Sequence, residues 1–189
     1  MKSLNIYTLS AFLILTITSS CIKENLSSDD NQGVKSVKTN TTDTNITYEL
    51  NNTLTSLEID SLISKDEVDI SNEVLDQINK YRKHIGLNDL INNKTAKIQA
   101  LSHSNHQAKL SHMSHDNSSD RIQVLFQMEK ANFYGENVAF GYSNIEQLIA
   151  AWIKSDSHRE NLEGNFTHSG IGTIANDKGV LYFTQVFFK

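Results

Sequence analysis

The chain has 189 residues, a net charge of -5, no proline and a single cysteine, Cys21. This length favours one folded domain with appendages over two full domains. The acidic balance and the lack of a basic cluster argue against a nucleic-acid partner, because phosphate binding needs grouped Lys and Arg side chains. One cysteine also excludes an internal disulfide, so core packing must hold the fold together.

The N-terminus predicts an export signal followed by a lipid attachment site. A Met-Lys pair leads into a mostly apolar stretch over 4–17, which is too short to span a bilayer comfortably but is typical of a secretory signal. Small residues follow at 18–20, and then comes Cys21. This order resembles a bacterial lipoprotein signal, although Thr18 stands where that family commonly has Leu. The alternative is a plain signal peptide with an incidental cysteine.

Residues 1–20 are therefore predicted to be a lipoprotein signal peptide, and residues 21–70 a lipidated Cys21 with a flexible tether. The tether is rich in Ser, Thr, Asn and Asp and has one aromatic residue, Tyr48. Such a composition buries too little apolar surface to offset the entropy of ordering. Apolar positions scattered over 46–62 predict transient structure at most. A coil of this length would reach about 40 Å from the membrane.

Residues 71–189 are predicted to form the folded domain, which begins with helices. Apolar residues recur at helical spacing from Val74 to Ile85, and Gly86 is placed to end that helix. Further helices are predicted over 94–110, 121–130 and 145–154. The last of these has Asn144 as its N-cap.

Extended segments complete the predicted domain. A turn leads into a short extended segment over 135–141. Two strands, over 171–175 and 180–187, flank an Asn-Asp-Lys-Gly turn, which predicts a hairpin. The domain is therefore of the α+β class.

Three motifs far apart in the chain carry the chemistry. His115 lies in Met-Ser-His-Asp, Glu136 in Gly-Glu-Asn-Val-Ala-Phe-Gly, and His158 in Trp-Ile-Lys-Ser-Asp-Ser-His-Arg-Glu-Asn-Leu. The chain then closes on Thr-Gln-Val-Phe at 184–187. In this order the motifs resemble the bacterial branch of the CAP superfamily, which comprises cysteine-rich secretory, antigen 5 and pathogenesis-related 1 proteins and is also named for the SCP domain. The resemblance covers about residues 72–189.

The resemblance implies an α-β-α sandwich with a central antiparallel sheet. It also implies a cleft in which many members hold two His and two Glu residues that can bind a divalent metal such as zinc. By motif, His115, Glu136 and His158 match three of these four residues, and Ser155 stands where the second Glu would fall. These four are the predicted cleft residues, and the first three are the candidate metal ligands.

The chemistry of these residues leaves two interpretations open. Two imidazoles and a carboxylate suit zinc and would leave a coordination position for water, which could support hydrolysis. The same side chains could instead form a hydrogen-bonded polar network around a cleft. His103 and His106, three residues apart on a predicted helix, are a second and weaker metal candidate. No catalytic residue is assigned.

The leading functional hypothesis is a non-enzymatic module of the bacterial cell envelope, anchored to the membrane through its lipid. It would bind a ligand or protein partner that the sequence does not identify. The alternative is a metal-dependent, protease-like hydrolase that uses the His/Glu cleft. A third hypothesis is a structural or adhesive envelope protein.

Overall fold

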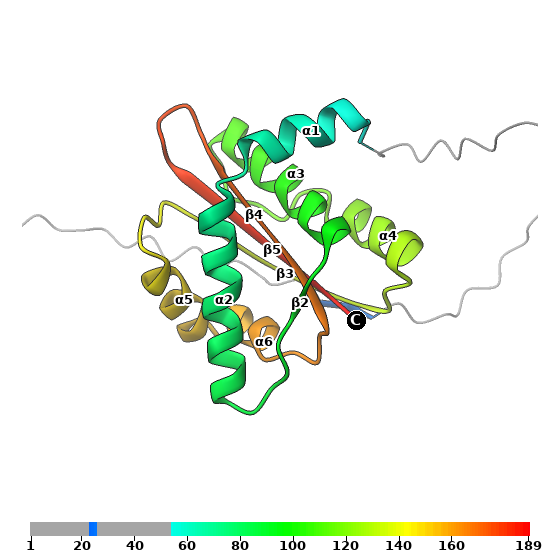
Figure 1. The fold of residues 1–189 in the computed structure, drawn as a ribbon, viewed down its shortest axis with the longest axis vertical. Helices are drawn as coiled ribbons and strands as arrows, with labels where there is room; N and C mark the ends of the chain where they lie inside the picture. Colours follow the sequence, from blue (N-terminus) through cyan, green and yellow to red (C-terminus); the bar gives the residue numbers. More distant parts are fainter. Residues whose placement is uncertain (1–22, 26–53) are drawn as a thin grey trace, which may run out of the picture.

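The computed structural model describes residues 23–25 and 54–189, and these form an α-β-α sandwich (Figure 1). The predicted fold class is confirmed. The signal peptide and Cys21 lie outside the described residues. In the part of the chain that the structure describes, no helix combines the length and the apolar character needed to cross a membrane.

The described helices are α1 (Ser56–Lys65), α2 (Val68–His84), α3 (Lys94–Leu110), α4 (Ser118–Glu129), α5 (Ile145–Lys154) and α6 (Asp156–Leu162). Helices α3 and α5 have the predicted bounds, because Asn93 and Asn144 cap their N-termini. Each Asn side chain accepts a hydrogen bond from a backbone N–H in the first turn of its helix. Helix α6 was not predicted, since seven residues are too few to show a helical period.

The sheet has the strand order β1-β3-β5-β4-β2. Its strands are β1 (Lys23–Asn25), β2 (Ile91–Asn92), β3 (Phe133–Phe140), β4 (His168–Ala175) and β5 (Leu181–Phe188). All pairings are antiparallel except that of β2, which runs parallel to β4. Strands β4 and β5 form the predicted hairpin, and Gly179 in its turn has a φ of +74°, a conformation that favours glycine.

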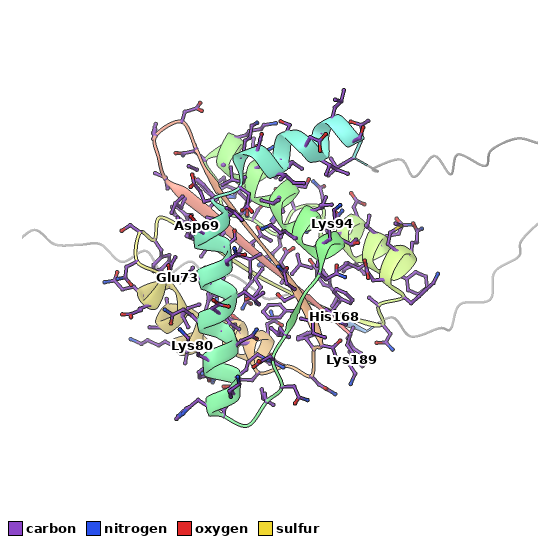
Figure 2. All side chains as sticks on the ribbon, in the orientation of Figure 1. Asp69, Glu73, Lys80, Lys94, His168 and Lys189 are labelled. Atoms are coloured by element: carbon purple, nitrogen blue, oxygen red, sulfur yellow. The ribbon has the colours of Figure 1, made fainter. Side chains whose placement is uncertain are left out.

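Helices cover both faces of the sheet, so the inner strands are buried on both sides. Helices α2, α5 and α6 pack on one face, and α3 and α4 pack on the other (Figure 1). Helix α3 lies very close to β4. A Cβ on Gly172 would come within 2.4 Å of the backbone nitrogen of Leu101, so only glycine fits there. The outer face of α2 is polar, as Asp69, Glu73 and Lys80 show (Figure 2).

The folded part begins earlier than the predicted boundary at residue 71. Helix α1 lies inside the segment predicted to be a flexible tether, and its Leu62 is buried in a cluster with Leu101 and Ile174. Helix α2 begins at Val68, and the Ser71 hydroxyl donates to Thr173 Oγ1 at 3.0 Å. The tether prediction is therefore wrong for residues 54–70.

Strand β1 also falls in the predicted tether, because Lys23–Asn25 pair with Phe133–Gly135 of β3. Residues 26–53 of the predicted tether lie outside the described residues. A three-residue strand is too short to show a period, and the prediction for α1 followed the polar composition of the whole segment rather than the helical spacing of Ile59, Leu62 and Ile63.

Candidate functional site

Glu136 is the centre of the site and lies in the middle of β3. Successive side chains of a strand point to opposite faces of the sheet. Tyr134 and Glu136 therefore face the layer of α3 and α4, whereas Asn137 faces α6. Beyond the three residues that pair with β1, the outer edge of β3 carries no described strand.

The Glu136 carboxylate is fully buried, and among the described residues its two oxygens accept hydrogen bonds from the side chains of Arg121, Tyr134 and His115. Arg121 donates from Nε to Oε2 at 2.7 Å and from Nη2 to Oε1 at 2.8 Å. The Tyr134 hydroxyl donates to Oε2 at 2.6 Å. His115 Nδ1 lies 2.8 Å from Oε1. The carboxylate is thus enclosed by a guanidinium, a phenol and an imidazole.

This arrangement keeps Glu136 ionised. Burial by itself raises the pKa of Glu136, but the hydrogen bond from His115 and the charge of Arg121 outweigh it and lower the pKa to about 2. Burial lowers the pKa of Arg121, yet the charge of Glu136 raises it above its ordinary value. Burial and the same carboxylate raise the pKa of Tyr134 well above its ordinary value, so the phenol stays a donor.

His115 lies in the connection between α3 and α4, and its side chain is 11% exposed. Because Glu136 is ionised and can only accept, His115 Nδ1 carries the hydrogen that it donates. That bond fixes the ring orientation. The same connection is tied down by Arg121, whose Nη1 donates to the carbonyl oxygen of Asp116 at 2.7 Å.

His158 and Ser155 reach the site from the other helical layer. Ser155 is the N-cap of α6, and its Oγ shares a hydrogen bond of 2.8 Å with His158 Nδ1. The His158 ring stacks on Trp152 with ring centres 6.3 Å apart. Burial, followed by the nearby charge of His115, lowers the pKa of His158. At neutral pH the imidazole of His158 is therefore uncharged.

The structure brings all four predicted cleft residues together beside the middle of β3. His115 is hydrogen-bonded to Glu136, and Ser155 is hydrogen-bonded to His158. The two pairs are near each other, because the charge of His115 contributes to the lowered pKa of His158. Asn137 joins the two pairs, because its Nδ2 donates to the carbonyl oxygen of His158 at 3.1 Å.

Four residues of this network were not predicted as site residues: Arg121, Tyr134, Asn137 and Asn161. Asn161 Nδ2 donates to both Glu136 O and Asn137 Oδ1 at 3.0 Å. A signal for Arg121 did exist, since it shares a helix face with buried Leu125, and a charged residue on an apolar face needs a buried partner. Tyr134 lies two residues before Glu136, the spacing that places both on one face of a strand.

His103 belongs to the same buried network rather than to a second metal site. Its Nε2 lies 2.7 Å from the carbonyl oxygen of Ser114 and 3.9 Å from Glu136 Oε1. Burial and then the charge of Arg121 lower the pKa of His103 to about 4. Its neighbour His106 stacks on it at 6.1 Å and lies 3.6 Å from Asp116 Oδ2.

The predicted ligand set fits a metal poorly. A divalent cation would need a lone pair of Glu136, but both oxygens accept hydrogen bonds and the guanidinium of Arg121 already supplies the positive charge. Among the described residues, no group of three or more His, Cys, Asp or Glu side chains is arranged to hold a metal ion. His115, Glu136 and His158 therefore do not form a three-ligand site in this geometry.

Comparison with known proteins places this fold and site in a family. The family model described as the cysteine-rich secretory protein family, CAP, matches residues 75–187. The chain belongs to the CAP family. The match includes all four cleft residues, so the network around Glu136 lies inside the CAP domain.

The relatives are bacterial proteins. The uncharacterized protein YkwD of Bacillus subtilis is 39% identical over 56 residues, which are 29% of this chain and 21% of that protein. An outer surface protein of Borrelia burgdorferi shares the fold with a TM-score of 0.58 and 20% identity, over 64% of this chain and 92% of that one. An extracellular SCP-domain protein of Bacillus anthracis has a TM-score of 0.53 and 26% identity, over 73% of this chain and 45% of that one. The chain thus spans about a fifth of the curated relative that it matches.

Proposed function

We propose that this protein is an exported CAP-domain protein of the bacterial cell envelope that binds a ligand or partner protein without catalysing a reaction. Export is supported by the apolar N-terminal segment and by the names of two structural neighbours, an outer surface protein and an extracellular protein. The CAP domain supplies the binding surface, and Cys21 supplies the membrane anchor.

The observation that carries the non-catalytic proposal is the enclosure of Glu136. A general base needs a lone pair that reaches the proton it removes. The oxygens of Glu136 are instead occupied by Arg121, Tyr134 and His115, and the residue has no solvent exposure. Glu136 thus acts as a structural anion that positions His115, and the polar ligand would be bound by the imidazole and hydroxyl groups of His115, His158 and Ser155.

Zinc titration of the purified full chain tests the polar-network interpretation. We expect no saturable zinc binding in a calorimetric titration, because Glu136 is not available as a ligand. The matched variants are His115→Ala and His158→Ala, with His84→Ala as the control on the exposed end of α2. One-to-one binding that disappears in both cleft variants and persists in the control would overturn this interpretation.

The alternative of a metal-dependent hydrolase is tested on the same proteins. We expect no hydrolysis of broad peptide and ester panels above the level of His158→Ala, with or without added zinc. Hydrolysis that a chelator abolishes and that His158→Ala loses would establish the hydrolase and refute the binding module. The hydrogen bond between Ser155 and His158 favours a metal-independent form of this alternative, since a serine beside a neutral imidazole is an arrangement that hydrolases use.

A further inference from the structure

Three lysines from three separate elements meet around one hollow on the surface. Lys65 ends α1, Lys109 lies in the last turn of α3, and Lys178 lies in the turn between β4 and β5. The hollow has a volume of about 450 Å³. Its other lining residues are Asn105, Ala108, Ser111, Ile174, Ala175, Asn176 and Asp177. We call this hollow the lysine groove.

Among the described residues, no side chain forms an ion pair with the lysines of the groove. No ion pair among the side chains of residues 54–189 involves Lys65, Lys109 or Lys178. By contrast, Lys97 pairs with Asp66 at 2.7 Å. Asp177 is the one acidic residue among the described residues of the lining, where three positive charges face one negative charge in a chain whose net charge is -5. An unpaired positive cluster on an acidic protein attracts anions.

A second hollow continues the lysine groove along α1. It has a volume of about 310 Å³ and shares Lys65, Asn105 and Lys109 with the first. Its acidic residue, Glu58, accepts hydrogen bonds from Thr55 N and Thr55 Oγ1 at 2.8 Å each. These bonds lower the pKa of Glu58 and hold its carboxylate in the N-terminal cap of α1. The Glu58 carboxylate is thus held by Thr55, and the extended groove adds the side chains of Ser61, Ser102 and Asn105 to the lining beside the lysines.

We propose that the lysine groove binds a soluble anionic ligand that carries two or more phosphate groups. Ammonium groups are effective point-charge partners of phosphate. The three lysines converge on a hollow, which suits a ligand that enters it better than a flat membrane surface. The elongated shape suits a chain of phosphates better than a single ion. The groove shares no residue with the cleft around Glu136, so this site is separate from the proposed cleft function.

Calorimetric titration of the full chain with tripolyphosphate at low salt tests this site. The groove variant combines Lys65→Gln, Lys109→Gln and Lys178→Gln. The control variant removes the same charge elsewhere through Lys80→Gln, Lys94→Gln and Lys189→Gln, which lie well apart on the molecule (Figure 2). We expect saturable binding that the groove variant weakens at least about tenfold and the control variant less than about threefold. Binding should also weaken as salt is raised, because salt screens exposed charges.

Three outcomes would overturn the site. They are no saturable binding in the parent chain, an equal loss in both triple variants, or binding only to vesicles of phosphatidylglycerol. Equal urea midpoints of the two variants should confirm that folding is retained. A second variant, Lys178→Glu, reverses one charge in the turn between β4 and β5. We expect it to weaken tripolyphosphate binding to the same extent. His115→Ala should leave phosphate binding unchanged, which separates failure of the groove from failure of the cleft.

Discussion

The ion pair between Arg121 and Glu136 is the residue-level feature on which the site depends. Both side chains are buried, at 5% and 0% exposure, and each is the other's main compensation for lost hydration. We expect Glu136→Gln to lower the free energy of unfolding by about 3–5 kcal/mol, because it leaves a buried cation without its partner. Urea denaturation of the variant and the parent measures this loss.

The double variant Arg121→Met with Glu136→Gln is the control for that prediction. Removing both charges should cost less than the sum of the two single changes, since neither variant side chain leaves an isolated ion. If the losses in the double-mutant cycle were simply additive, the ion pair would not be the source of the stability.

The lowered pKa values of His103 and Glu136 predict loss of stability in acid. His103 has a pKa of about 4 in the folded chain, below its ordinary 6.5, so the unfolded state binds the proton first and stability falls as the pH drops from 6.5 to 4. Over this range the free energy of unfolding falls by about 3 kcal/mol. Glu136 has a pKa of about 2 against an ordinary 4.5, so its contribution is complete above pH 4.5 and is lost as the pH falls towards 2.

Urea midpoints measured from pH 7 to pH 3 test this prediction. In the variant His103→Gln, the urea midpoint should depend less on pH between 6.5 and 4. The loss of stability below pH 4.5, which comes from Glu136, should remain. An unchanged slope in this variant would mean that another group binds the proton.

At the scale of elements, α1 is a structural part of the domain, although it lies in the segment whose composition predicted a flexible tether. Leu62 is 6% exposed and packs in the cluster with Leu101, whereas Leu57 on the same helix is 79% exposed. We expect Leu62→Ala to destabilise the chain by about 2–4 kcal/mol, because it removes a buried side chain and leaves a cavity. Leu57→Ala should change stability by less than about 0.5 kcal/mol. Equal effects in urea denaturation would show that α1 does not pack as described.

The elements that could be predicted from the sequence are those with a local physical signal. Helices α3 and α5 begin at asparagine caps, and the β4–β5 hairpin turns at Gly179. By contrast, α1 depends on one buried leucine and β1 on pairing with a strand more than a hundred residues away. Long-range pairing of this kind leaves no periodic pattern in the segment itself.

The site residues also divide into those that a local sequence motif identifies and those that depend on contacts between distant parts of the chain. Family motifs identified His115, Glu136 and His158, but the residue that neutralises Glu136 came from a helix face fifteen residues earlier in the chain. Arg82 is a parallel case. It is 2% exposed, and its Nη1 donates to the carbonyl oxygen of Leu162 at 2.7 Å. Buried cations of this kind lie on amphipathic helices where a surface position is the ordinary expectation, and only the assembled fold reveals their partners.

At the scale of the whole molecule, strand β1 shortens the expected distance between the predicted anchor, Cys21, and the folded domain. Only Ile22 separates Cys21 from Lys23, the first residue of β1, and two residues of extended chain span about 7 Å at most. Lys23 pairs with Gly135, the residue before Glu136. A lipid on Cys21 would therefore hold the edge of β3 close to the bilayer, rather than at the end of a tether about 40 Å long.

The anchor itself is tested by Cys21→Ser in the full chain. Attached acyl chains contribute about 0.8 kcal/mol for each buried CH₂, so two or more chains hold a protein on a membrane stably. We expect the parent in the membrane fraction after cell lysis and the variant in the soluble fraction, with incorporation of a labelled fatty acid in the parent alone. Ser20→Ala, which keeps both a small residue and Cys21, is the matched control and should stay with the membrane. Retention of Cys21→Ser at the cell surface without lipid would mean that a surface of the folded domain, rather than the anchor, fixes the protein there.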